Sequence, residues 1–437
     1  MADGFSMKQN VAFDRASGRV RIRMYNVASK LGLAHLPSQI YVMLVLNLLF
    51  AIGRNLAFPY LAMYLTGKSV NGGLEMDPSL IGFMFMVGGL AYIFPLLVSG
   101  SLCDKFGRRG MILLFVVPQV FLTAGYAYAS SFVEFLALYV AGGVLGAFFD
   151  PAFSAMVADL VVEPSRREEV YGLSYMIANI ATVFAPPIGG LIASASGYSV
   201  LFMYAVVFMS VCAVIVFVFI KESLPERDRA RSIALAQLGG VFRDRLFIIF
   251  CCVGALTNVV YSQLYGLLSV YTEYVGLPPY AFGILFSVNG AMVVTLQIPI
   301  RKGAVRIGST KAFVVAQLLY AVGFTYFLVS RDFLQFLVGV VVLTLGEIIF
   351  SPAISAFVAN LSPVDMRGRY MALSGLFYGV GSSVGTMVGF RLYDVLSNKE
   401  LIWGVLGSVG FATLPGYLYL MKANRKVEEN SASSQKN

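Results

Sequence analysis

The stretch GSLCDKFGRRG, from Gly100 to Gly110, places one acid and three bases between two long apolar runs. Charge at this density is unusual in the chain, because 58% of its 437 residues are hydrophobic and only 13% are charged. A helix needs roughly 20 apolar residues to cross the hydrocarbon core of a bilayer. The stretch therefore predicts a polar turn between two membrane-spanning helices.

The rest of the chain repeats this pattern of apolar runs and short polar connections. The mean hydropathy of +0.78 lies outside the range of soluble proteins and predicts an integral membrane protein. Twelve spans are expected, near residues 41–65, 80–103, 110–130, 132–160, 169–194, 199–220, 246–274, 280–302, 311–330, 333–360, 368–393 and 401–421.

The basic residues alternate between the two sides of the predicted membrane. The net charge is +9, yet all but five of the 32 Lys and Arg lie in the leader, in the tail or in connections after even-numbered spans. The exceptions are Arg54, Lys68, Arg331, Arg391 and Lys399. This positive-inside distribution predicts a multi-pass protein of the cell membrane with both termini in the cytoplasm, and it argues against nucleic acid as a partner.

The chain also contains an internal repeat with an offset of 201 residues. DPAFSAMVADL, from Asp150 to Leu160, aligns without a gap with SPAISAFVANL, from Ser351 to Leu361. The predicted fold is therefore an all-α membrane protein of twelve transmembrane helices arranged as two six-helix repeats. The expected parts are a leader (1–40), two bundles (41–220 and 246–421), a linker (221–245) and a tail (422–437).

The charged turn and the six-plus-six organisation resemble the major facilitator superfamily over essentially the whole chain. Gly100, Leu102, Asp104, Gly107 and the Arg108-Arg109 pair match the signature turn of that family. Three segments, GAFFDPAFSAMVAD, GEIIFSPA and RGRYMALSGL, resemble its drug:proton antiporter branch. The resemblance implies that two bundles rock around a central cavity lined by spans 1, 4, 7 and 10.

The turn is also a candidate gate. The Asp104 carboxylate is expected to meet the positive N-terminal end of span 11, and Arg108 or Arg109 to pair with Asp159. Gly107 would let the turn bend tightly. The alternative is that the bases only fix the topology. The predicted gating residues are Gly100, Asp104, Gly107, Arg108, Arg109 and Asp159.

Three charged residues fall inside predicted spans away from their ends, where an isolated charge is expensive and functional roles are common. Arg54 and Asp150 lie at comparable depth, as a buried pair that is either functional or only structural. Glu347 has no base at its depth in its own half, so burial should favour its neutral, protonated form. We expect Glu347 to be the first candidate for proton coupling and Asp150 the second. The alternative for Glu347 is a protonated side chain that only bonds a neighbouring helix.

Polar and aromatic residues in or beside the cavity-lining spans are candidates for binding an amphiphilic substrate, although most such residues serve packing alone. They are Asn55, Phe58, Tyr139, Phe149, Asn258, Tyr261, Gln263 and Tyr265.

The sequence as a whole favours a proton-coupled secondary transporter that exports lipophilic or amphiphilic small molecules. An uptake symporter or a carrier of lipid-like substrates of the same fold is the alternative, and a non-transporting receptor or channel is the candidate from another class. The sequence contains no HExxH or P-loop motif, which argues against an enzyme. No cofactor or metal is predicted. The expected partners are the substrate, protons and the lipid bilayer, and a monomer is expected.

Overall fold

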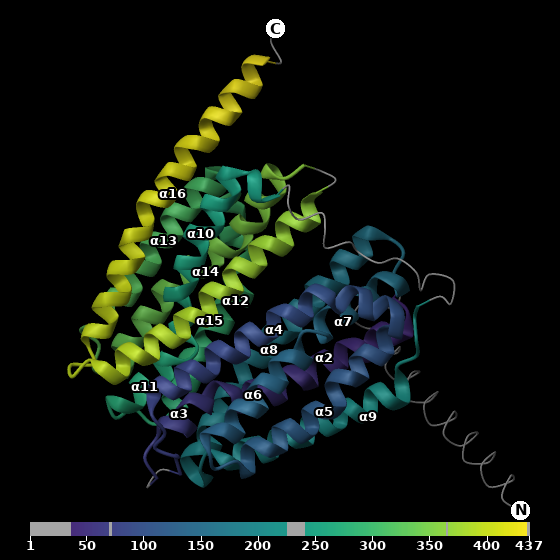
Figure 1. The fold of residues 1–437 in the computed structure, drawn as a ribbon, viewed down its shortest axis with the longest axis vertical. Coiled ribbons are helices and arrows are strands. Elements are labelled where there is room, and N and C mark those ends of the chain that lie inside the picture. Colours follow the sequence, from purple (N-terminus) through teal and green to yellow (C-terminus); the bar gives the residue numbers. More distant parts are fainter. Residues whose placement is uncertain (1–35, 70–71, 225–240, 364–365, 435–437) are drawn as a thin grey trace, which may run out of the picture.

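The computed structural model describes residues 36–69, 72–224, 241–363 and 366–434. Most of the predicted leader, the middle of the predicted linker and the last three residues lie outside this range. Within it the only regular elements are helices (Figure 1), which confirms the predicted fold class.

The helices of the first half correspond to spans 1 to 6. Their bounds are α2 Ser38–Ala57, η1 Phe58–Tyr60, α3 Leu61–Thr66, α4 Pro78–Phe106, α5 Arg108–Tyr128, α6 Phe132–Gly146, α7 Phe149–Leu160, α8 Pro164–Ser196 and α9 Ser199–Phe219. Span 4, which the sequence presents as one run, is divided into α6 and α7. Pro151 lacks the amide hydrogen that would bond the carbonyl of Ala147, and the break lies at that turn.

The helices of the second half correspond to spans 7 to 12. Their bounds are α10 Arg245–Tyr261, η5 Ser262–Leu264, α11 Leu267–Tyr274, α12 Pro279–Ile307, α13 Ser309–Tyr326, α14 Phe333–Leu361, α15 Arg367–Val395 and α16 Leu401–Ser434. Residues 422–434 of the predicted tail continue α16 as one helix, since they contain neither glycine nor proline.

Eleven spans among the described residues are long and apolar enough to cross a membrane. The twelfth expected span is α13, which is shorter and includes Lys311 and the buried Gln317. It packs between α14 and α16, and Gln317 faces protein, whereas Lys311 is exposed near the start of the helix. Several helices begin with a side-chain cap: Asp77 accepts from Ser79 at 2.7 Å at the start of α4, and Ser131 and Glu134 form a capping box on α6.

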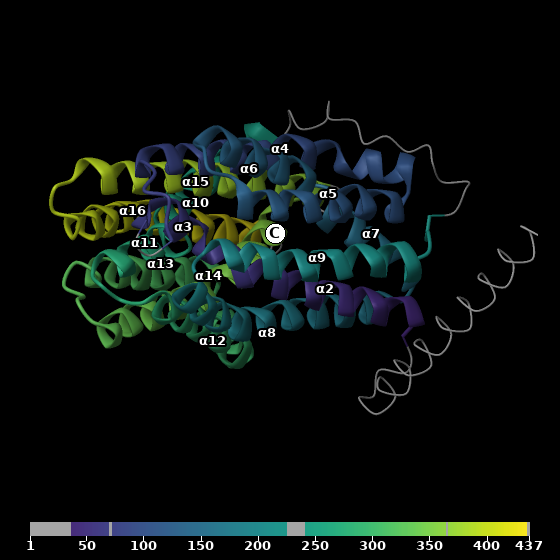
Figure 2. The same ribbon diagram turned by 90° about the horizontal axis from the view of Figure 1, so that it is seen from below.

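The helices form two groups that contact each other most closely near α3 and α11 and diverge toward the opposite ends (Figure 1). Between the groups, α8 packs on α12 and α4 packs on α15. Figure 2 shows α8 lying between α2 and α12. The α4–α15 contact is closest near the start of α4, where Gly82 lies against Phe390 and Gly89 against Ser383. The charged turn lies at the other end of α4.

Candidate functional site: a charged turn, a buried glutamate and two cavities

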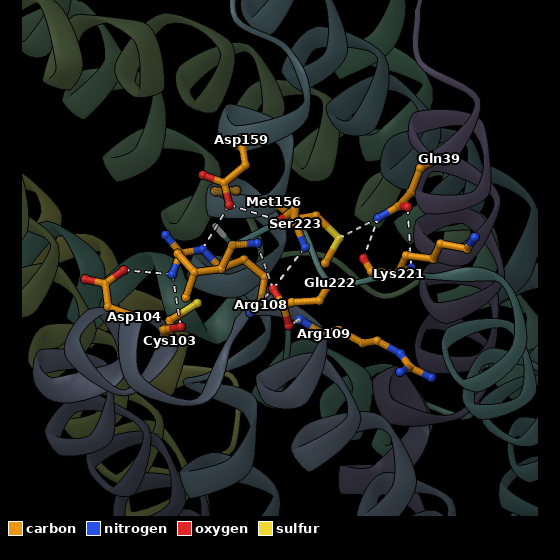
Figure 3. A network of polar contacts seen from close by, with 12 residues as sticks. Gln39, Cys103, Asp104, Arg108, Arg109, Met156, Asp159, Lys221, Glu222 and Ser223 are labelled. Atoms are coloured by element: carbon orange, nitrogen blue, oxygen red, sulfur yellow. Dashed lines mark hydrogen bonds and ion pairs between the residues drawn. The ribbon is translucent and has the colours of Figure 1, made fainter. Parts of the chain in front are cut away.

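The charged turn is a single residue, Gly107, because α4 runs to Phe106 and α5 begins at Arg108. Gly107 has φ 84° and ψ 158°, a backbone conformation that is essentially restricted to glycine. A Cβ at this position would lie 2.3 Å from a carboxylate oxygen of Glu222. That carboxylate accepts hydrogen bonds from the backbone amides of Arg108 at 2.9 Å and Arg109 at 3.1 Å (Figure 3). Glu222, from the segment after α9, therefore caps the N-terminus of α5.

The Arg108 side chain joins three helices of the first half. Its guanidinium pairs with Asp104 of α4 at 2.8 Å and with Asp159 of α7 at 3.1 Å, and it also donates to the carbonyl of Cys103 at 3.0 Å (Figure 3). Only 8% of Arg108 is exposed, so these bonds compensate for the lost hydration of the charge. Ser223 adds a bond to Asp159 at 2.9 Å.

The geometry separates the predicted gating residues by role. Arg108 is the base that reaches Asp159, whereas Arg109 bonds the carbonyl of Phe217 at 2.7 Å. Asp104 pairs with Arg108 in this conformation, and its expected contact with the start of span 11 stays a prediction. Gly100 lies within the last turns of α4.

Arg54 and Asp150 line one cavity of about 260 Å³ whose lining residues all belong to the first half. Both side chains are exposed to this cavity. Their charges attract each other, but no direct ion pair joins them in the described part of the chain. The structure thus brings the two residues together without the close pairing that the sequence suggested as an option.

Glu347 lies near the middle of α14 and is held by neutral groups. Asn289 of α12 donates to its carboxylate at 2.7 Å and to Thr344 at 3.0 Å. The hydroxyl of Tyr261 also interacts with Glu347, and it is bonded to the hydroxyl of Tyr265 at 2.9 Å. Among the described residues, no base forms an ion pair with Glu347.

A second cavity, of about 370 Å³, lies between the two halves. Arg54, Phe58, Gly89 and Tyr139 line both cavities, which are therefore neighbours. Tyr265 contributes to the wall on the side of the second half, so the tyrosine pair connects this cavity with Glu347.

The predicted substrate residues divide into two sets. Five of them line a cavity: Asn55, Phe58, Tyr139, Phe149 and Tyr265. The other three do not line either cavity in this conformation. Asn258 bonds the carbonyl of Gly254, Tyr261 lies behind Tyr265, and Gln263 is fully buried against the carbonyl of Gly385.

Sequence reasoning missed three residues that the geometry brings forward: Glu222, Asn289 and Gln119. A signal for Asn289 was present, because it is a polar residue near the middle of span 8 as Glu347 is near the middle of span 10. Glu222 appeared to be one more charge of the linker. Gln119 appeared to be an isolated polar residue of span 3.

Two polar contacts join the halves at the end remote from the charged turn. The hydroxyl of Tyr198 donates to Glu273 of α11 at 3.2 Å. Ser79 of α4 donates to Asp394 of α15 at 2.5 Å and accepts from Arg391 at 3.1 Å. These bonds join the two halves at that end.

The chain is similar to known transporters over most of its length. The family model described as Major Facilitator Superfamily matches residues 43–309 and 264–437. A protein of Planococcus maritimus named "Na(+), Li(+), K(+)/H(+) antiporter" is 26% identical over 84% of this chain and 91% of its own. The "Multidrug resistance protein MdtH" of Salmonella arizonae is 24% identical over 85% of this chain and 91% of its own.

Solved structures share the fold at lower sequence identity. A crystal structure titled as a peptide transporter POT in complex with sulfate has a TM-score of 0.74 and 17% identity. The match covers 90% of this chain and 95% of that one. At this identity the likeness concerns the fold alone.

Proposed function

Because the chain belongs to the major facilitator superfamily and is a multi-pass membrane transporter, we propose that it is a proton-coupled antiporter that exports small molecules by alternating access. The observation that carries the proposal is Glu347, a carboxyl group in mid-span that is bonded by neutral groups and linked to the cavity between the halves. An intramembrane acid without a base is a site where a proton can bind and leave. Of the two relatives named above, one is named as a cation/proton antiporter and the other as a multidrug resistance protein. These names support the proposal of a proton-coupled exporter.

The proton route that we propose runs through the tyrosine pair. Tyr265 faces the cavity between the halves, Tyr261 lies behind it, and Glu347 lies behind Tyr261. Hydroxyl groups both donate and accept, so the pair can pass a proton to the carboxylate. Protonation cancels the Glu347 charge and weakens its bond from Asn289, which ties α12 to α14. In this way the protonation state of one residue biases the packing of two helices.

The gating residues fit the same proposal. With the termini in the cytoplasm of a cell membrane, the contacts of Ser79 and Tyr198 close the outer end, and the end that carries Gly107 faces the cytoplasm. The described conformation is then open to the cytoplasm. Asp104 would exchange part of its pairing with Arg108 for the N-terminus of α15 when the cytoplasmic ends close.

The experiment that tests the proposal is flux in liposomes with an imposed pH difference and a pH-sensitive dye inside. Ethidium, Na⁺ and K⁺ are offered as cargo, because the relatives' names include both drugs and cations. We expect Glu347→Gln to lower gradient-driven flux at least roughly tenfold while the protein stays folded, because the amide cannot release a proton. Glu163→Gln, at an exposed acid at the start of α8, is the control and should keep the flux.

Gradient-driven flux of Glu347→Gln at the rate of the unmodified protein would refute the proton site. Flux that persists unchanged after the gradient is collapsed would instead indicate a channel, and proton uptake together with cargo uptake would indicate a symporter.

A further inference from the structure

The cavity lined by the first half carries charged, polar and aromatic groups that proton transfer does not require. Its volume of about 260 Å³ is slightly below the range of roughly 300–1,000 Å³ that is typical of ligand pockets. It therefore fits a small ligand of one or two rings. Its walls come from α2, α4, α5, α6, α7 and α9, and it opens beside the cavity between the halves.

The polar groups of this cavity are of both signs. Arg54 presents a cation and Asp150 an anion to the same space, without a direct ion pair between them. Two opposite charges that share a cavity yet stay apart leave room for a ligand that carries the complementary pair.

Gln119 is an independent sign of a missing partner. It lines the same cavity, and only 7% of it is exposed. Its amide nitrogen donates to Thr123 at 3.4 Å, but its carbonyl oxygen has no hydrogen-bond partner among the described residues. A buried acceptor without a donor is unfavourable, so the site is suited to a ligand with an N–H group.

The remaining walls are aromatic and glycine-rich. Phe149 lies 5.0 Å from Phe50 and 5.1 Å from Phe115 between ring centroids. On α6, Gly142 and Gly146 lie one turn apart on the same face, and a Cβ on Gly146 would approach only cavity-lining rings. A Cβ on Gly142 would meet nothing within 4 Å. A flat ring can lie against this open face and the aromatic walls.

We propose that this cavity binds a small aromatic zwitterion, with its ammonium group at Asp150 and the Gln119 carbonyl, its carboxylate at Arg54 and its ring between the phenylalanines and the α6 glycines. The site is a substrate subsite of the transporter proposed above, and to that extent it rests on the proposed function. It leaves Glu347 of the second half for the proton.

Three indole compounds with the same ring test the proposal: tryptophan is the zwitterion, tryptamine the cation and indole-3-propionate the anion. Binding is measured by equilibrium dialysis of the radiolabelled compounds against the full chain in detergent, without a pH difference. We expect tryptophan to bind at least roughly tenfold tighter than either of the others, since each of those lacks one charge-assisted bond.

Three variants test the orientation of the ligand. Asp150→Asn should lower the affinity for tryptophan to that for indole-3-propionate. Arg54→Gln should lower the affinity for tryptophan to that for tryptamine. Gln119→Leu should weaken the binding of tryptophan and tryptamine but leave the binding of indole-3-propionate nearly unchanged. A purely structural role of these residues would weaken all three compounds alike.

A matched pair of glycine variants tests the location. Gly142→Val places a branched side chain in the cavity, at a position where its Cβ meets nothing within 4 Å, and should abolish tryptophan binding. Gly172→Val, at an exposed position of α8 where a Cβ also meets nothing within 4 Å, should leave tryptophan binding unchanged.

The proposal is overturned if tryptophan does not bind, if it binds no tighter than both other compounds, or if Gly142→Val binds it as the unmodified protein does. These outcomes are separate from failure of the proposed function. Tryptophan binding without gradient-driven flux of any cargo would refute proton-coupled transport alone, and gradient-driven flux without tryptophan binding would refute the subsite alone.

Discussion

Replacing Gly107 by alanine should destabilise the protein more than the same change at Gly308, its counterpart in the repeat. The two glycines have nearly the same backbone, with φ 84° at both and ψ of 158° and 151°. Any residue with a Cβ pays about 1–3 kcal/mol for this conformation, so the strain is common to both variants. The environments differ: a Cβ at Gly107 would lie 2.3 Å from the Glu222 carboxylate, whereas one at Gly308 meets nothing within 4 Å.

The excess cost at Gly107 follows from the bonds that Glu222 would lose. The added methyl group pushes the carboxylate off the amides of Arg108 and Arg109, which are two of the orphan donors at the start of α5. Loss of an N-terminal cap typically costs about 1 kcal/mol. We therefore expect Gly107→Ala to be less stable than Gly308→Ala by about 1 kcal/mol.

The assay is unfolding of the detergent-solubilised protein by increasing SDS, followed by circular dichroism. Both variants are compared in the unmodified chain and in a Glu222→Ala background, as a double-mutant cycle. The excess should disappear in that background, because the cap is already absent. Equal stability of the two single variants, or an excess that survives in Glu222→Ala, would refute the argument.

Three further predictions concern the packing around the sites. Arg108→Met should cost roughly 2 kcal/mol more than Arg109→Met in the same unfolding assay, since only the former leaves two carboxylates without their base; equal costs would contradict the network. Gly143→Ala places a Cβ 2.4 Å from the carbonyl oxygen of Gly88, so this variant should lower the yield of monodisperse protein in size-exclusion chromatography. Gly110→Ala, whose Cβ would meet nothing within 4 Å, should keep the yield of the unmodified protein. Ser79→Ala removes the hydroxyl that joins α4 to α15 at the end that we propose faces outward. It should increase the labelling, by a hydrophilic maleimide added from outside, of a cysteine placed in the cavity between the halves; unchanged labelling would contradict a role of this contact in closing that end.

Much of the fold could be predicted from the sequence, because a bilayer constrains the length and composition of every helix that crosses it. Each span needs a long apolar run, and the repeat of DPAFSAMVADL as SPAISAFVANL identifies corresponding positions in the two halves. The pairing of Arg108 with Asp159 could also be predicted, because the ends of spans 2 and 4 lie on one side of the membrane. Helix ends were less predictable: α4 and α5 continue through residues of the charged turn until only Gly107 separates them.

The partners of the candidate site could not be predicted, because they depend on how helices rotate and cross. Nothing in the sequence states which residue faces Glu347, and only the packing of α12 on α14 places Asn289 there. The same holds for Gln119, whose exposure to a cavity depends on the glycine face of α6. Polar residues such as Gln263 point elsewhere, although their types and positions were equally suggestive.

The placement of Glu222 only three residues beyond the end of α9 makes the first half self-contained. The groups that form hydrogen bonds around Gly107 all belong to residues up to 224. Cleavage of a peptide bond within residues 225–240 would therefore leave these donors and acceptors on the same polypeptide. At Gly308, the corresponding glycine of the second half, a Cβ would meet nothing within 4 Å. The repeat is thus asymmetric at this turn: in the first half a carboxylate joins the turn to the segment that follows the last helix, whereas in the described part of the second half a Cβ at Gly308 would be free of contacts.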